Sequence, residues 1–250
     1  IAKIIAEFHR EARSDDETSV FGTPEAVRRN VVENFEQTRK SVHSYVQPSE
    51  AREIERCQLG FLEEHGALFH QRIEMGRVRD GHGDLRLEHV YLDDDGHVTI
   101  IDCIEFNDRF RYADTCADIA FLSMDLACHG RVDLAEQFLA IYARESGDFD
   151  LYPLVDFYEG YRAYVRGKIA SLLASDSDAR EESRQRMALE ARRYFLLSLA
   201  AKRAPLIPPS VIVVGGMIGS GKSTLSNALS LEMAAPVVEA DRTRKQLLGV

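Results

Sequence analysis

Long apolar runs, cysteine pairs and excess positive charge are all missing from this 250-residue sequence. No apolar run approaches the roughly 20 residues of a membrane-spanning helix, and no signal peptide is visible. The four cysteines (Cys57, Cys103, Cys116 and Cys128) form neither a CxxC pair nor a zinc-like spacing with histidine. This usage favours reduced thiols and a cytoplasmic protein. The formal net charge of −10 argues against a general nucleic-acid or anionic-membrane surface.

What the sequence does contain is typical of a globular protein, with 45% hydrophobic and 29% charged residues. Apolar residues recur at helical spacing along most of the chain. The expected helices cover approximately residues 1–14, 23–48, 49–66, 67–75, 115–130, 133–145, 154–173 and 179–203. The tyrosines and basic residues of 154–173 indicate a packed helix with a charged outer face more than a nucleic-acid site. The proline-rich stretch 205–209 predicts a domain boundary.

One stretch, residues 82–106, departs from this helical pattern and reads HGDLRLEHVYLDDDGHVTIIDCIEF. Two β-prone runs, 90–92 and 98–101, flank a set of acidic turn residues that ends in Asp95-Gly96. Asp-Gly between such runs is the strongest short hairpin signal, because a type I′ turn needs two residues that tolerate positive φ. We therefore expect a β-hairpin with a two-residue turn.

In that register His89 faces Asp102, so the hairpin carries Asp102 back beside the loop that holds His82 and Asp84. A register error of one or two residues would not separate them. Two carboxylates and an imidazole would then meet at the open end of the hairpin. Phosphoryl transfer needs such groups: one carboxylate orients an attacking hydroxyl and accepts its proton, and another holds Mg²⁺ on the nucleotide phosphates.

HGDLRLEHV followed by IDCIEF resembles the catalytic and metal-binding segments of the aminoglycoside phosphotransferase and choline kinase group, relatives of protein kinases. The resemblance implies that Asp84 is the catalytic aspartate and that Asp102 is a metal-binding aspartate. His89 stands where the family usually has Asn as a second metal ligand, and it either binds metal or only hydrogen-bonds within the loop. His82 is expected to hold the loop. Asp118 is expected to anchor it from a neighbouring helix, or to be only an N-terminal helix carboxylate.

The same resemblance implies a small nucleotide-binding lobe, with a glycine-rich loop and an ATP-positioning lysine, ahead of a helix like that of residues 1–14. Neither feature is present in this sequence. We therefore expect residues 1–204 to be the large lobe alone and the chain to be a fragment.

A second strong pattern, the phosphate-loop motif GxxxxGK[ST], spans Gly216 to Ser223. An apolar run at 211–214 precedes it as an expected buried strand, and residues 224–233 follow as an expected helix. Backbone N–H groups of such a loop wrap phosphate oxygens at the helix N-terminus. The predicted nucleotide-binding residues are Gly216, Gly219, Ser220, Gly221, Lys222, Ser223 and Thr224. Lys222 would reach the β- and γ-phosphates, and Ser223 would bind Mg²⁺.

Residues 237–240 are expected to form a second strand that ends at Asp241. This arrangement resembles the small P-loop kinases of the gluconate kinase and zeta-toxin type, in which an aspartate at this point orients the acceptor hydroxyl. The resemblance implies a catalytic role for Asp241; the alternative is that Asp241 caps the next helix.

The sequence thus predicts an α+β chain. Residues 1–204 would be a mostly helical, protein-kinase-like lobe around one hairpin, and residues 208–250 the first β-α-β of a P-loop domain. The expected function is ATP-dependent and Mg²⁺-dependent phosphorylation of a small-molecule hydroxyl. Two alternatives stay open: a metal-dependent hydrolase that uses His82, Asp84, His89 and Asp102 as ligands, and a nucleotide-binding pseudokinase.

Overall fold

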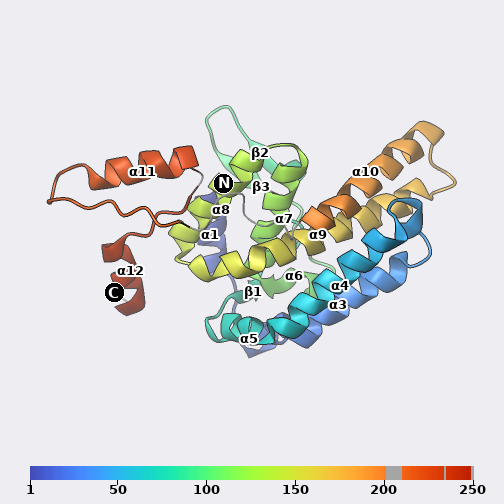
Figure 1. Ribbon diagram of the computed structural model, residues 1–250, viewed down its shortest axis with the longest axis horizontal. Coiled ribbons are helices and arrows are strands. Elements are labelled where there is room, and N and C mark those ends of the chain that lie inside the picture. Colours follow the sequence, from blue (N-terminus) through green and yellow to red (C-terminus); the bar gives the residue numbers. More distant parts are fainter. Residues whose placement is uncertain (201–209, 234, 249–250) are drawn as a thin grey trace.

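Helices make up most of the chain in the computed structural model, which describes residues 1–200, 210–233 and 235–248 (Figure 1). The α-helices are α1 (Ala2–Glu11), α2 (Asp16–Ser19), α3 (Pro24–Thr38), α4 (Pro48–Glu64), α5 (Gly66–Glu74), α6 (Asp108–Arg111), α7 (Thr115–Cys128), α8 (Val132–Ser146), α9 (Tyr152–Ala174), α10 (Glu181–Ala200), α11 (Lys222–Met233) and α12 (Ala240–Leu248). Short 3₁₀ turns lie at Val20–Gly22, Val42–Ser44, Leu87–His89 and Phe149–Leu151. Among the described residues, no helix is both long enough and apolar enough to cross a membrane.

Capping residues explain where several helices begin. The Thr23 hydroxyl accepts a hydrogen bond from the Ala26 N–H at 3.2 Å, and Pro24 follows as the first residue of α3. Pro48 likewise opens α4, because a proline lacks only an N–H that the first turn does not use. The expectation that one helix runs as far as residue 48 is therefore wrong, since α3 ends at Thr38 and the next helix begins at the proline.

The core lies around α7, which is buried along nearly its whole length. Helices α8 and α9 pack against it, and α10 runs side by side with α9 (Figure 1). Helix α1 packs on α8. Because α7 has no solvent-facing stripe, any polar side chain on it needs a partner inside the protein.

Two small antiparallel sheets complete the fold: β1 (Val78–Asp80) pairs with β4 (Tyr112–Asp114), and β2 (Val90–Leu92) pairs with β3 (Val98–Ile100). The first pair joins segments far apart in sequence and was not predicted. The second is the expected hairpin. A mostly helical α+β fold with a small hairpin is confirmed for the described residues.

The turn of this hairpin has three residues (94–96) between Asp93 and His97, so the predicted two-residue turn is wrong. The Asp93 N–H donates to the His97 carbonyl at 3.1 Å, and the Asp93 carboxylate accepts the His97 N–H at 2.7 Å. Gly96 has a φ of +82°, as the last residue of a three-residue loop requires. Val90 therefore pairs with Ile100, one residue away from the predicted register.

The C-terminal segment departs further from prediction. Residues 211–214 and 237–239 form no strand, and α12 already begins at Ala240, so both predicted strands are wrong. A strand needs a neighbour to accept its backbone hydrogen bonds. In the described part of the chain the segment 211–214 has no neighbouring strand, and residues Val211 and Val213 are 89% and 85% exposed. The predicted boundary at 205–209 and the predicted helix end near residue 203 lie outside the described residues.

Candidate functional site

The loop that carries HGD is fixed by a buried carboxylate on α7. Asp118 accepts the backbone N–H of His82 at 2.6 Å and that of Gly83 at 2.8 Å. The prediction that Asp118 anchors this loop is confirmed. On its other side, His9 of α1 places Nε2 3.3 Å from the same carboxylate.

Asp118 can do this because it is held as a carboxylate inside the core. Its side chain is almost fully buried, and burial alone would raise its pKa. The hydrogen bond from His9 and the charges of His9 and Arg162 outweigh burial, so the pKa of Asp118 lies below its usual value.

Glycine is required on both sides of His82 by the closeness of these contacts. A Cβ on Gly81 would lie 2.5 Å from the Asp118 Oδ2 atom. Gly83 has a φ of +79°, and a Cβ there would lie 2.8 Å from the Phe110 carbonyl oxygen. The GHG sequence therefore lets the loop sit directly on α7 and on the backbone of α6.

His82 uses both ring nitrogens to hold the loop, as predicted. Its Nε2 donates to the Ile101 carbonyl oxygen at 2.9 Å, and its Nδ1 accepts the Asp84 N–H at 3.3 Å. Since neither nitrogen is free, His82 ties the start of the loop to the end of the hairpin. It is not part of the group of ligand atoms described next.

Asp84, His89 and Asp102 come together at the open end of the hairpin, each offering one atom within 4.8 Å of the others. The His89 Nε2 atom lies 3.4 Å from the Asp102 Oδ2 atom. The one-residue register error does not separate these groups. His89 is buried, whereas the Asp102 side chain is 73% exposed, so the group opens to solvent on the Asp102 side.

The tautomer of His89 follows from its contacts. Its Nδ1 lies 2.8 Å from the Asp84 backbone carbonyl oxygen, which can only accept, so Nδ1 carries the proton. Nε2 is then the acceptor, and Arg86 Nη2 donates to it at 3.2 Å. A neutral imidazole is the form that binds metal ions, and a metal ion at Nε2 would have to displace the N–H of Arg86.

Asp102 has an unusual backbone. Its φ of +66° is the one positive value for a non-glycine among the described residues. Aspartate tolerates this region better than most side chains, and such conformations collect at functional sites. The left-handed residue ends the hairpin and turns the chain toward α6.

Arg86 is a member of the site that the sequence analysis missed. Its Nε and Nη2 atoms each donate to the Asp84 carboxylate at 2.9 Å, and it also pairs with Glu88. Burial alone would raise the pKa of Asp84, but the hydrogen bonds and charge of Arg86 lower it below the usual value. Asp84 is therefore ionised at neutral pH. In the sequence, the position of Arg86 two residues after the aspartate of HGDLR was the available signal.

Asp125 was also missed. Its Oδ2 atom accepts the Leu87 N–H at 2.9 Å and so fixes the loop a second time, one residue beyond Arg86. Asp118 and Asp125 are seven residues apart, which places them on one face of α7. Two acids at this spacing in an otherwise apolar helix were the available signal.

The predicted phosphate loop has part of the expected geometry. Gly219 and Gly221 have φ values of +79° and +81°, and α11 begins at Lys222, two residues earlier than predicted. The Lys222 ammonium folds back on the loop and donates to the Met217 carbonyl oxygen at 2.6 Å. Gly216 lies close to the loop's own Ser220, whose hydroxyl would be 2.7 Å from a Cβ at that position.

Ser223 and Thr224 lie in the first turn of α11, so the seven predicted nucleotide-binding residues are contiguous with one helix N-terminus. Asp241 is in the first turn of α12, where its carboxylate pairs with Arg244 at 2.6 Å and Lys245 at 3.1 Å. The alternative prediction that Asp241 caps the next helix is wrong, because α12 already begins at Ala240 and the Asp241 carboxylate pairs with side chains of the same helix. These contacts do not bring Asp241 to the phosphate loop.

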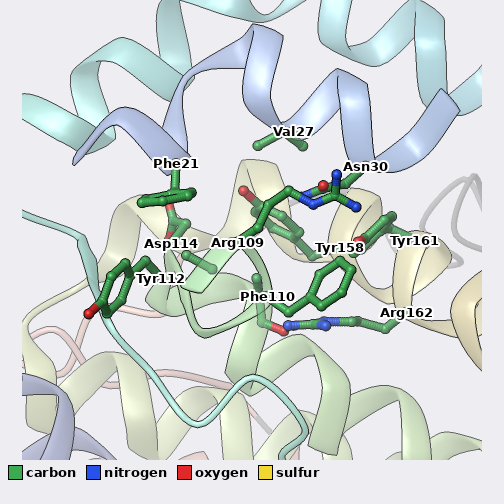
Figure 2. A pocket seen from close by; sticks show the side chains of 12 residues that line it. Phe21, Val27, Asn30, Arg109, Phe110, Tyr112, Asp114, Tyr158, Tyr161 and Arg162 are labelled. Atoms are coloured by element: carbon green, nitrogen blue, oxygen red, sulfur yellow. The ribbon is translucent and has the colours of Figure 1, made fainter. Parts of the chain in front are cut away.

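A small cavity lies behind α6, between α3 and α9 (Figure 2). Its volume is about 30 Å³, and the Asn30 Oδ1 and Arg109 Nε atoms beside it are buried without a hydrogen-bond partner among the residues that the structure describes. Since one water needs about 10–15 Å³ of such space, this cavity has room for one or two waters that would satisfy those atoms. It is too small for an acceptor molecule.

The chain is similar to curated proteins of two mycobacteria. It is 35% identical over 247 residues to "Uncharacterized protein Mb2027c" of Mycobacterium bovis and, equally, to "Uncharacterized protein MT2060" and "Uncharacterized protein Rv2004c" of Mycobacterium tuberculosis. The match covers 99% of this chain and 48% of each relative. The chain therefore spans about half the length of these relatives. No family model and no solved structure matches it.

Proposed function

We propose that the protein containing this chain is an ATP-dependent phosphotransferase that acts on a hydroxyl of a small molecule. The observation that carries the proposal is the convergence of Asp84, His89 and Asp102 at one open site. The sequence resemblance of HGDLRLEHV and IDCIEF to aminoglycoside phosphotransferases supports it. The resemblance also predicts two units, 1–204 and 208–250, each associated with a nucleotide.

In this proposal Asp84 orients the acceptor. Arg86 occupies the carboxylate through two hydrogen bonds and lowers its pKa, so Asp84 is a weak base that positions the hydroxyl and takes its proton late. The acceptor oxygen forms a bond to the γ-phosphorus of ATP, the bond to the bridging oxygen breaks, and ADP leaves. The hydroxyl proton passes to Asp84 and then to solvent.

The donor atoms of the site fit a divalent cation. Asp102 offers an exposed carboxylate, and the His89 Nε2 atom lies 3.4 Å from it, where a cation would replace the N–H of Arg86 that Nε2 accepts. A cation held there would neutralise the charge of the nucleotide phosphates. Because Mg²⁺ prefers oxygen ligands, Asp102 would be its main protein ligand and His89 an additional one better suited to Mn²⁺.

The second nucleotide site of the proposal is the loop from Gly216 to Ser223. Positive φ at Gly219 and Gly221 is a backbone conformation typical of anion-binding loops, and α11 adds the positive end of its dipole. Lys222 supplies the fixed cation for the β- and γ-phosphates, and Ser223 is the proposed ligand for Mg²⁺ there. Asp241 remains a proposed catalytic residue of this unit on the family resemblance alone.

The test is ATP consumption by the full-length protein with a panel of sugars, aminoglycosides and nucleosides. We expect one acceptor class to stimulate ADP release and to gain phosphate. Asp84→Asn should lower that stimulated rate by about a hundredfold to ten-thousandfold, the usual contribution of a positioned base. Asp94→Asn, in the exposed hairpin turn, is the matched control and should leave the rate unchanged. Stimulated turnover that survives Asp84→Asn would refute the proposal.

One observation favours a second candidate, a metal-dependent hydrolase. The His89 tautomer keeps the proton on Nδ1, so Nε2 would be the ligand atom of a hydrolytic zinc or manganese site if the metal displaced the Arg86 N–H that Nε2 accepts at 3.2 Å. The engagement of Asp84 by Arg86 opposes this function, since a carboxylate that accepts two guanidinium hydrogen bonds is a poor third ligand. Stoichiometric Zn²⁺ or Mn²⁺ in the purified protein, with hydrolysis that needs no nucleotide, would support the hydrolase.

A further inference from the structure

Arg86 lies where a cation would be held in the candidate site. Its Nη2 atom donates to the His89 Nε2 atom at 3.2 Å and to one oxygen of the Asp84 carboxylate at 2.9 Å. Its Nε atom donates to the other oxygen of Asp84 at 2.9 Å, and its Nη1 atom pairs with the Glu88 carboxylate. One guanidinium group therefore contacts three polar side chains around the site.

These side chains need a positive charge among them. His89 carries its proton on Nδ1, so its Nε2 atom has an unshared electron pair. The Asp102 Oδ2 atom lies 3.4 Å from Nε2, and the Glu88 Oε1 atom lies 3.7 Å from it. Carboxylate oxygens this close to an unprotonated nitrogen repel it and each other unless a cation lies near them. The Arg86 guanidinium supplies that charge.

Asp102 is the one residue of the candidate metal site that Arg86 does not bind. Among the described residues it forms no ion pair with Arg86, and its side chain is 73% exposed, whereas that of Arg86 is 10% exposed. An ion arriving from solvent would therefore meet the Asp102 carboxylate first. It would reach His89 only after the Arg86 N–H had left Nε2, because a ring nitrogen has a single lone pair.

A second and larger cavity, of about 240 Å³, gives the guanidinium group room to move. It lies beside Arg86, between the HGD loop and helices α7, α9 and α10. One water needs only about 10–15 Å³ of such space, so a guanidinium group fits. Among the described residues, its lining holds, apart from Arg86, three carboxylates and two guanidinium groups, from Glu88, Asp125, Glu190, Arg166 and Arg193. A guanidinium group that turned inward would therefore balance these charges.

We propose that Arg86 is an internal cation that holds the candidate metal site in the ion-free protein and exchanges with a divalent ion at His89. When an ion binds, Arg86 withdraws its Nη2 hydrogen bond from Nε2 and turns its Nη groups toward the cavity. The Nε hydrogen bond to Asp84 uses other atoms and is not part of the exchange. The exchange rests on the proposed phosphotransferase for the task of the bound ion, but it requires no nucleotide.

The test is Mn²⁺ binding to the nucleotide-free full-length protein, measured by the loss of the electron paramagnetic resonance signal of free Mn²⁺. Arg86→Met removes the guanidinium group and keeps a long unbranched side chain. We expect this variant to bind Mn²⁺ about tenfold to hundredfold more tightly than the wild type, the factor that corresponds to the loss of one competing charged hydrogen bond. Unchanged or weaker Mn²⁺ binding would overturn the proposal.

A second variant covers the case in which Arg86→Met does not fold, since the Arg86 side chain is largely buried. Arg86→Gln keeps a polar amide in the loop but has no charge. It should also bind Mn²⁺ more tightly than the wild type, and circular dichroism identifies which of the two variants is folded. A folded Arg86→Gln protein with wild-type Mn²⁺ affinity would overturn the proposal as well.

Two controls separate the exchange from a general change of charge. Arg193→Gln removes a positive charge from the same cavity, and among the described residues Arg193 has no hydrogen bond or ion pair with the three candidate ligand residues. It should change Mn²⁺ affinity by at most about fivefold. In a His89→Ala background, Arg86→Met should bring a similarly small gain, because no Nε2 atom is left to release. A gain that is equal with and without His89, or equal in Arg193→Gln and Arg86→Met, would overturn the proposal.

The exchange and the phosphotransferase fail in different ways. If Arg86→Met gains Mn²⁺ affinity through His89 but no acceptor is phosphorylated in an Asp84-dependent manner, the exchange stands and the phosphotransferase fails. If an acceptor is phosphorylated and the Mn²⁺ affinity of the nucleotide-free protein does not respond to Arg86→Met, the phosphotransferase stands and the exchange fails.

Discussion

Replacing Asp118 by asparagine should loosen the HGD loop and destabilise the whole protein. Asp118 is 2% exposed and accepts two backbone N–H groups, from His82 and Gly83, at 2.6 and 2.8 Å. In Asp118→Asn one acceptor oxygen becomes an NH₂ group, so one of those N–H groups faces a donor. The uncharged amide also gives up the attraction of His9 and Arg162, which lie 3.3 and 3.9 Å away.

The expected loss of unfolding free energy is about 3 kcal/mol. A hydrogen bond to a charged group contributes roughly 1.5–3 kcal/mol, and leaving a buried donor without an acceptor costs roughly 1–3 kcal/mol more. Removing one partner of a buried ion pair lowers the free energy of unfolding by about 3–5 kcal/mol. The lower end of this 3–5 kcal/mol range applies here, because asparagine keeps the shape of the side chain and one of its oxygens.

Urea denaturation followed by circular dichroism measures this loss, with Asp94→Asn as an exposed control that should leave the midpoint unchanged.

The pH dependence of the unfolding free energy adds a second readout. The folded pKa of Asp118 is lowered, so its contribution is complete above the unfolded value of about 3.9 and is lost as the pH falls through the folded pKa. The difference in stability between the wild type and Asp118→Asn should therefore begin to shrink below about pH 4 and disappear only below the folded pKa of Asp118. Equal midpoints for Asp118→Asn and Asp94→Asn at neutral pH would refute this account of the anchor.

Two further predictions concern sites away from this anchor. Lys222→Ala should sharply weaken ATP binding at the C-terminal loop, because the loop loses its one proposed phosphate cation; titration with a fluorescent ATP analogue measures this, and unchanged affinity would contradict the assignment. Arg72→Met should lower the unfolding free energy by about 3–5 kcal/mol, since it leaves two carboxylates buried side by side. Arg72 is 1% exposed and bridges Asp114 and Asp148, and a urea midpoint close to that of the wild type would show that those carboxylates find other partners.

The sequence predicted those parts of the fold that depend on neighbouring residues. Thr23-Pro24 marks a helix start in any context, and acidic residues before Gly96 mark a turn. The exact turn was not predictable from Asp-Gly alone, because the Asp93 carboxylate accepts two N–H groups of the loop and so favours three turn residues over two.

The pairing of strands that lie far apart in the sequence could not be predicted. Strand β1 has three residues and pairs with β4 more than thirty residues later, so neither shows a period of its own. The opposite error occurred at 211–214, where four apolar residues predicted a strand that has no partner among the described residues. Local preference does not determine strand formation without a neighbour.

In the candidate site, too, the features that depend on nearby residues were predictable and those that depend on distant packing were not. Asp84, His89 and Asp102 were predictable because one hairpin brings them together and tolerates a register error. Arg86 was visible but unassigned, since its pairing with Asp84 depends on the loop conformation. Asp125 acts through a backbone N–H, and only the packing of α7 against the loop reveals that.

The measurement that tests the central claim most directly compares Mg²⁺-ATP affinity, metal content and turnover in three variants of the full-length protein. Asp84→Asn should cut turnover about a hundredfold or more while Mg²⁺-ATP affinity stays near that of the wild type. Asp102→Asn should weaken both, and His89→Asn should keep Mg²⁺-dependent activity because it supplies an oxygen ligand. Equal and complete loss of bound metal from all three variants would contradict the phosphotransferase and favour the hydrolase.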